Sequence, residues 1–101
     1  MIRKRKVLIS DTVKGKIAEL KLYLTEEYKF SFEAAMFRTK RMEEFIETLA
    51  NPADYSLCRF LRWRKFGYRC AVFEKTWIFA YEIFDDGVIV RDMAHVSMLK
   101  E

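Results

Sequence analysis

The spacing of the apolar residues changes once along this chain, at Asn51-Pro52, and this change constrains the fold more than any other feature. Before it, apolar residues recur every three or four positions, which is the period of a helix that buries one face. After it, aromatic and β-branched residues gather in short runs, which is typical of strands. A chain with helices first and several strands afterwards is expected to form an α+β domain.

Two helices are expected before Asn51. Ser10 and Ser31 each offer a hydroxyl that can cap the start of a helix. Because both apolar stripes advance by the steps of a helix face, we interpret them as core and expect the helices to pack as an antiparallel pair. The first stripe is Val13, Ile17, Leu20 and Leu24, and the second is Phe32, Ala35, Met36, Thr39, Met42, Ile46 and Leu49.

Four strands are expected around these helices. Residues 7–9 predict one strand ahead of the first helix, and residues 68–74, 76–84 and 88–93 predict an antiparallel meander. Glu74-Lys75 is a tight connection, and Asp85-Asp86-Gly87 predicts a hairpin turn in which Gly87 adopts a positive φ. Residues 56–66 fit either an irregular strand or a loop.

The predicted architecture is a single α+β domain over residues 1–101. It consists of an N-terminal strand, a helical hairpin and the three-strand meander, with one sheet and the helices packed on one of its faces. Residues 1–6 form a basic arm, and residues 96–101 form a short C-terminal tail.

Positive charge is concentrated in two places. The chain carries a net charge of +4, to which residues 1–6 contribute +4 and residues 57–75 contribute +5, while the rest sums to −5. Clustered cations favour a phosphate-rich partner or an acidic protein, and a solvated strand face is the plain structural alternative. Aromatic residues alternate with the cations, as suits exposed nucleotides, and the predicted binding residues are Arg59, Arg62, Arg64, Lys65 and Tyr68.

The chain shows neither a membrane span nor a secretion signal. No apolar run approaches the roughly 20 residues that cross a bilayer, and the run after the basic start is too short for a signal peptide. We therefore expect a cytoplasmic protein that does not bind membranes.

Cys58 and Cys70 are the only cysteines, and in that compartment we expect reduced thiols, with Cys70 packed in the sheet. One histidine and two cysteines do not complete a zinc site, so neither a metal nor another cofactor is expected.

Several segments together resemble one protein family. The predicted helical hairpin ends in Leu49-Ala50-Asn51-Pro52, residues 77–83 form an aromatic and apolar strand, and an acidic turn at 85–87 precedes the last strand. His95 falls where many family members end that strand with a histidine. From about Val7 to His95 the chain resembles the RelE/ParE superfamily of bacterial type II toxins.

This resemblance implies that the chain is the toxin of a type II toxin–antitoxin system. RelE-type members are ribosome-dependent endoribonucleases that cut messenger RNA, and their partner is a small acidic antitoxin. ParE-type members instead bind DNA gyrase and cut nothing themselves. A decayed member would retain only antitoxin binding. The sequence favours the RelE type and leaves the other two open.

The resemblance also suggests catalytic residues. RNA cleavage through the 2′-hydroxyl needs a base, an acid and cations for the phosphate. The candidates are His95 for proton transfer and Arg69 and Arg91 for phosphate, with Glu82, Tyr81 or Tyr68 as the second proton-transfer group. The structural alternatives are a histidine that merely ends a strand and arginines that pair with Glu82 or Asp92.

Two departures from the family pattern affect this assignment. Val96, Ser97 and Met98 replace the terminal Gly-Arg-Arg of many members. Alignment of the family's Gly-Tyr-Arg on residues 67–69 retains Arg62, Arg64 and Arg69. Alignment on the turn at 85–87 instead places Ile78 at the position of the nuclease arginine and leaves Arg69 on the neighbouring strand. Hairpin length favours the second alignment. The set of catalytic residues that the nuclease members carry is therefore only partly present in this sequence.

Overall fold

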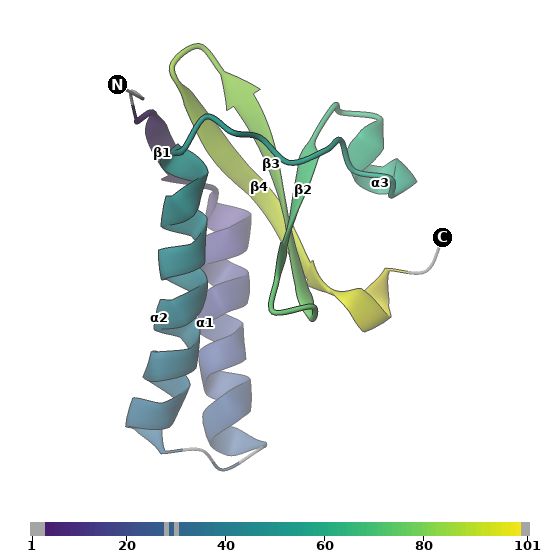
Figure 1. Ribbon diagram of the computed structural model, residues 1–101. Coiled ribbons are helices and arrows are strands. Elements are labelled where there is room, and N and C mark those ends of the chain that lie inside the picture. The colour runs from purple at the N-terminus through teal and green to yellow at the C-terminus, as the bar shows by residue number, and fades with distance from the viewer. Residues whose placement is uncertain (1–3, 28, 30, 100–101) are drawn as a thin grey trace.

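The computed structural model describes residues 4–27, 29 and 31–99, and it shows an α+β fold (Figure 1). The first half contains β1 (Lys6–Ile9), α1 (Asp11–Glu26), α2 (Phe32–Glu47) and the short 3₁₀ helix η1 (Thr48–Ala50). The second half contains α3 (Leu61–Arg64), β2 (Arg69–Phe73), β3 (Trp77–Phe84), β4 (Gly87–His95) and η2 (Val96–Met98). The predicted fold class is confirmed. Residues 1–3 of the predicted basic arm lie outside the described residues.

The four strands form one sheet in the order β1-β4-β3-β2. β1 runs parallel to β4, and β2, β3 and β4 are an antiparallel meander. The helical hairpin therefore acts as the crossover that carries the chain from the edge strand β1 to the other side of β4. The β3–β4 pairing contains a bulge, because Ala80 pairs with Asp92 and Tyr81 with Val90, which leaves Arg91 as the extra residue.

Serine caps begin both long helices, as the sequence predicts. The Ser10 hydroxyl accepts a hydrogen bond from the amide of Val13, and the Ser31 hydroxyl accepts one from the amide of Ala34. The predicted stripes supply the buried side chains of these helices: Val13, Ile17 and Leu24 on α1, and Ala35, Thr39, Met42 and Ile46 on α2.

Two members of the second stripe are not core residues. Phe32 is 67% exposed and Met36 is 44% exposed. The reason is visible in Figure 1: the hairpin extends beyond the end of the sheet, so no strand covers the distal turns of α2. Helical periodicity identifies the inward face of a helix, but it does not say how far along that helix the sheet reaches.

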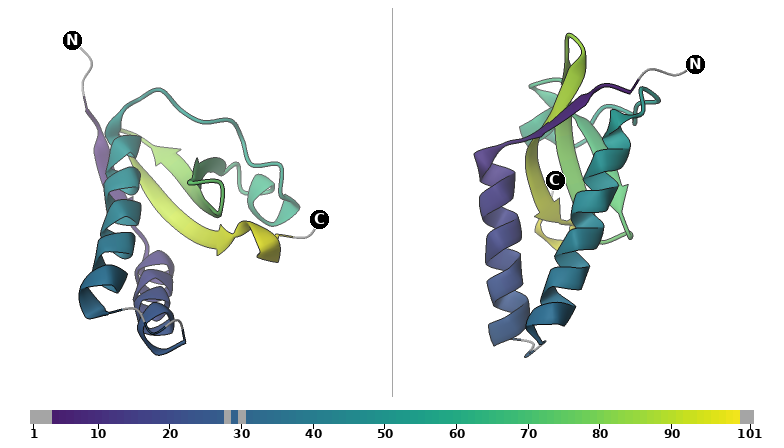
Figure 2. Two further views of the ribbon diagram at one scale, coloured as in Figure 1. Left: turned by 60° about the horizontal axis from the view of Figure 1, so that its bottom comes forward. Right: turned by 90° about the vertical axis from the view of Figure 1, so that its left-hand side faces the viewer.

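Each face of the sheet packs against a different part of the chain (Figure 2). On one face, Phe79, Tyr81, Val90 and Met93 pack against α1 and α2. On the other face, the segment 55–68, which we call the cap, covers Ile78, Ala80 and Ala94 with its buried residues Cys58 and Trp63. The helices do lie on one face as predicted, and the cap completes a second core on the other.

The cap includes residues 56–66, which the sequence left open between strand and loop. It contains both: Leu57 makes a single bridge to Arg69, and α3 follows four residues later. Gly67 closes the segment with a φ of +75°, a conformation that glycine adopts without a steric cost.

A disulfide joins the cap to β2, and the prediction of two reduced thiols is wrong for this structure. Cys58 and Cys70 are bonded, with an S–S distance of 2.19 Å and Cα atoms 4.9 Å apart. Their pairing depends on the chain doubling back: Cys58 donates its amide to the Tyr68 carbonyl, and Cys70 donates to the Ser56 carbonyl. The sequence does not reveal this reversal, because residues 56–66 lack a strand period.

The two hairpin turns are where the sequence predicts them, but the role predicted for Gly87 is wrong. Gly87 does not have a positive φ; it is the first residue of β4 and pairs with Lys6 of β1. A Cβ atom at Gly87 would lie 2.7 Å from the Lys6 carbonyl oxygen, so glycine is needed for the close approach of β1. At the other turn, Glu74 and Lys75 have φ values of 48° and 62°.

No helix among the described residues is both long enough and apolar enough to cross a membrane.

Candidate active site

His95 ends β4 on the face of the sheet that packs against the helices. It pairs with Trp77 across the sheet, and the two rings meet edge to face with centroids 5.3 Å apart. The amide of Ser97 donates to His95 Nδ1 at 3.1 Å, and Ser97 Oγ lies 2.8 Å from the same nitrogen. Because a backbone amide can only donate, Nδ1 is an acceptor and the neutral imidazole carries its proton on Nε2. Nε2 is therefore the nitrogen available for proton exchange.

The half-buried His95 lines a cavity of about 660 Å³ between α1, the end of the sheet and α3. Lys16, Glu19 and Tyr23 reach it from α1, where their spacing of three and four residues places them on one helix face. Arg62 of α3 adds a second cation. The remaining walls are apolar and consist of Leu20, Trp77, Met93, Ala94 and Met98.

Asp92 of β4 forms hydrogen bonds with side chains of α1 and α3 beside this cavity. Its carboxylate accepts hydrogen bonds from Lys16 Nζ at 2.7 Å and from Trp63 Nε1 at 3.1 Å, and Lys16 also donates to the Met93 carbonyl. Burial alone raises the pKa of Asp92, but the hydrogen bonds from Lys16, Trp63 and the Met93 amide outweigh it, and the net pKa is lowered. Asp92 is therefore a carboxylate at neutral pH and holds α1, β4 and the cap together.

The other two predicted catalytic residues do not lie in this cavity. Arg91 forms an ion pair with Glu82 on the neighbouring strand, which is one of the structural alternatives considered from the sequence. Arg69 donates to the Tyr55 carbonyl at 2.7 Å. Arg69 pairs with Tyr81, four residues along β3 from the partner of His95, so the two positions are about 13 Å apart along the sheet. The structure therefore does not bring the predicted trio together.

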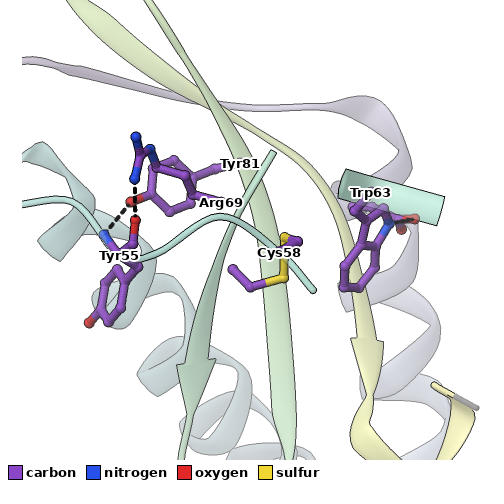
Figure 3. The surroundings of a disulfide bond; sticks show 7 residues. Tyr55, Cys58, Trp63, Arg69 and Tyr81 are labelled. Atoms are coloured by element: carbon purple, nitrogen blue, oxygen red, sulfur yellow. Dashed lines mark hydrogen bonds between the residues drawn. A yellow bond between two sulfur atoms is a disulfide. The ribbon is translucent and has the colours of Figure 1, made fainter. Parts of the chain in front are cut away.

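Arg69 belongs instead to a polar network at the opposite end of the sheet (Figure 3). The Tyr81 hydroxyl accepts from the Tyr55 amide at 3.0 Å and donates to Asp54 at 3.1 Å. Asp54 also forms an ion pair with Arg5, whose Nε donates to the Leu49 carbonyl. This network ties β1 and the start of the cap to β3.

The charges in this network shift three pKa values. The hydrogen bond with Arg5 is the main reason that the pKa of Asp54 is lowered, and the same bond raises the pKa of Arg5. Burial raises the pKa of Tyr81, and the neighbouring Asp54 adds to this effect. Arg5, which the sequence assigned to a basic arm, is therefore a structural cation.

The predicted binding residues all lie on the cap, but they point to different surroundings. Arg62 and Tyr68 line a hollow of about 330 Å³ together with Arg91. The Tyr68 ring stacks on Phe66 with centroids 5.3 Å apart. Arg59 lies over the ring of Phe60, Lys65 lies over that of Phe66, and Arg64 is exposed at the end of α3. These residues form a basic, aromatic surface beside the His95 cavity.

Sequence reasoning missed Lys16, Glu19 and Tyr23 as site residues. A signal exists, because they form a polar stripe beside the apolar stripe of α1. The stripe alone does not identify a site, since His95 is more than 70 residues away in the chain. Among the residues that the structure describes, no group of three or more His, Cys, Asp or Glu side chains is arranged to hold a metal ion.

Comparison with known proteins finds no relative at the level of families, sequences or structures. No family model matches the chain, no curated protein matches it, and no solved structure matches its fold.

Proposed function

We propose that this chain is the toxin of a type II toxin–antitoxin pair and that it cleaves messenger RNA at the His95 cavity. One observation carries the enzymatic part of this proposal: a histidine with one nitrogen available lines the same cavity as a carboxylate and two cations. These are the groups that cleavage through a 2′-hydroxyl requires. The toxin identity rests on the family resemblance and on the order of the helices and strands.

In this mechanism Glu19 acts as the base. It removes the proton of the ribose 2′-hydroxyl, whose oxygen then attacks the adjacent phosphorus. In protonated His95, Nδ1 donates to Ser97 Oγ instead of accepting from the Ser97 amide, and Nε2 gives its proton to the departing 5′-oxygen. The products are a 2′,3′-cyclic phosphate and a 5′-hydroxyl, and a proton-transfer step between Glu19 and His95 through water restores both groups.

The two cations of the cavity stabilise the charge that develops on the phosphate. Lys16 has three N–H donors, and its bonds to Asp92 and the Met93 carbonyl use two of them. Arg62 reaches the cavity from the cap. The stacked rings of Phe66 and Tyr68 lie on the same segment and offer faces for the unpaired bases that flank the cut.

The proposed partners follow from charge and compartment. A small acidic antitoxin would bind the basic surface of the cap, and the ribosome with its messenger RNA would be the target in the cytoplasm. Exposed apolar side chains on the distal helical hairpin, Leu22, Phe32, Met36 and Phe37, add surface that a protein partner would cover.

The test is primer extension on translated messenger RNA after induction of the chain in cells. Wild-type protein should create new 5′ ends, and His95→Ala and Glu19→Gln should each lower cleavage by about 10²- to 10⁴-fold. Arg69→Ala is the matched control: it removes a predicted catalytic residue that lies outside the cavity, and it should leave cleavage within about tenfold of wild type. Co-expression of a small acidic protein encoded beside the chain should suppress cleavage.

Two outcomes would contradict the proposal. Equal loss of cleavage in Arg69→Ala and His95→Ala would move the site away from the cavity. An absence of new 5′ ends, together with toxicity that survives in His95→Ala, would instead favour a toxin that acts by binding DNA gyrase. Circular dichroism of each purified variant establishes that it is folded.

A further inference from the structure

The disulfide lies where the cap joins the sheet. Cys58 is in the cap and is 1% exposed, whereas Cys70 is in the edge strand β2 and is partly exposed. Two backbone hydrogen bonds flank the disulfide, from Cys58 to the Tyr68 carbonyl at 2.9 Å and from Cys70 to the Ser56 carbonyl at 3.2 Å. The two cysteines are only twelve positions apart in the chain, and α3 lies between them. The bond therefore closes a short loop that carries one helix.

That loop forms part of the wall of the His95 cavity. Arg62 lines the cavity, and the neighbouring Trp63 is 3% exposed, with its indole nitrogen bonded to Asp92. Asp92 also holds Lys16, which lines the cavity from α1. A displacement of α3 consequently moves one cation of the cavity and removes a hydrogen bond that positions the other. Cys58 and Cys70 do not line the cavity themselves.

We infer that the Cys58–Cys70 disulfide is a redox switch that sets the closure of the cap and, through it, the arrangement of the cavity. The inference rests on the proposed function for the compartment and for the cavity. Cytoplasmic thiols reduce most disulfides, and those that form there are mainly transient bonds with catalytic or sensing roles. The oxidised chain holds α3 in place, and the reduced chain lets the cap that carries α3 open more often.

The chemistry is thiol–disulfide exchange with a dithiol reductant. A thiolate attacks the sulfur of Cys70, the more exposed partner, and the S–S bond breaks as a mixed disulfide forms. The second thiol of the reductant then displaces Cys70. Two electrons and two protons pass to the protein in total, which gives two cysteine thiols and one oxidised reductant. Oxidation by a disulfide of the same class reverses the step.

After reduction, the cap retains its two backbone hydrogen bonds and the packing of Trp63, so it remains folded but opens more often. A disulfide that closes a loop of this length lowers the entropy of the open state. By this effect it favours the closed cap over the open cap about a hundredfold. Reduction should therefore accelerate opening of the cap by about that factor. The α1–α2 hairpin packs on the other face of the sheet and should not follow.

Amide hydrogen exchange of the purified full chain tests the inference, with and without dithiothreitol. The amides of Cys58, Cys70 and Trp63 should exchange about a hundredfold faster after reduction. Amides of α2 that exchange through local opening, recognised by a weak dependence on urea, serve as the internal control and should change less than about threefold. Reoxidation should restore the slow exchange. The Cys58→Ser/Cys70→Ser protein should exchange like the reduced chain and should not respond to dithiothreitol.

Three results would overturn the switch. If reduction accelerates amide exchange equally in α2 and in the cap, the disulfide stabilises the whole fold rather than the cap. If amide exchange in the cap does not change, the disulfide does not hold the cap closed. A disulfide that stays intact in the folded chain in a glutathione buffer at the cytosolic ratio would not be a sensor. None of these measurements uses RNA, so the switch and the nuclease proposal fail separately. If the double variant does not fold, the reduced wild-type chain still decides the question.

Discussion

At the scale of single residues, Gly87 decides whether β1 can join the sheet. Its neighbour across the parallel pair is Lys6, and the Lys6 carbonyl oxygen lies 2.7 Å from where a Cβ would be. Because that atom belongs to the backbone, it cannot rotate away as the end of a flexible side chain can. A residue larger than glycine must push β1 away from β4 or bend the start of β4.

We predict that Gly87→Ala lowers the free energy of unfolding by about 1–3 kcal/mol, as overpacking of a rigid site does. Gly15→Ala is the opposite case, because Gly15 lies in α1 and a Cβ there meets no atom within 4 Å. It should raise the free energy of unfolding by about 0.5–1 kcal/mol through helix propensity. Urea denaturation of both variants measures this, and a stabilised Gly87→Ala protein would show that β1 accommodates the methyl group.

At the scale of elements, the β2–β3 turn adopts a conformation that its sequence does not favour. Glu74 and Lys75 both have left-handed φ values, as in the turns that connect tight hairpins, yet neither is glycine or asparagine. The turn closes through the Thr76 amide, which donates to the Phe73 carbonyl at 3.1 Å. Glu74 also pairs with Arg41 of α2, so the turn links the sheet to the hairpin.

We predict that Lys75→Gly raises the free energy of unfolding by about 0.5–1 kcal/mol. Glycine removes the steric cost of the left-handed conformation, about 1–2 kcal/mol, and part of this gain is offset by the greater entropy of the unfolded chain. Lys75→Ala is the control, since alanine retains the steric cost and should change stability by less than about 0.5 kcal/mol. Thermal unfolding of the two variants gives the comparison, and equal melting temperatures would refute the role of strain at this turn.

The elements also show what the sequence can predict. Periodicity and capping serines predict α1 and α2, and β-branched runs predict the meander, because these patterns reflect local geometry and burial. The cap has no period of its own. Its position depends on contacts with residues far along the chain, such as Trp63 with Asp92 and Cys58 with Cys70. Sequence patterns hold no information on those contacts, and the prediction of reduced thiols failed there.

At the scale of the whole molecule, the candidate site is assembled from three distant segments. His95 could be named from the sequence, because it is the only histidine and ends a predicted strand. Lys16 and Glu19 could not be linked to it, since only the packing of α1 along β4 places them beside it. Arg69 was a reasonable candidate by charge, but its register opposite Tyr81 sends it to the other end of the sheet.

Two carboxylates, Asp54 and Asp92, each join elements that are distant in the sequence, and both have a pKa below the usual range. Asp54 holds Arg5 and Tyr81, and Asp92 holds Lys16 and Trp63. In the unfolded chain both groups return to a pKa of about 3.9. The unfolded state therefore binds protons at a pH where the folded state does not. The stabilisation is present above about pH 4 and is lost as the pH falls through the lower folded values.

We predict that the free energy of unfolding is nearly level between about pH 7 and pH 5 and falls steeply below about pH 4. Asp92→Asn should cost about 1 kcal/mol at pH 7, because the partly exposed bond to Lys16 contributes little and the amide oxygen can still accept from Trp63. Because a protonated Asp92 has also lost its ion pair, the variant and the wild type should converge as the pH falls below the lowered pKa of Asp92 in the folded chain. Urea denaturation of the oxidised chain across this range measures both curves. If the two curves instead run parallel at every pH, Asp92 is not one of the groups whose protonation unfolds the protein.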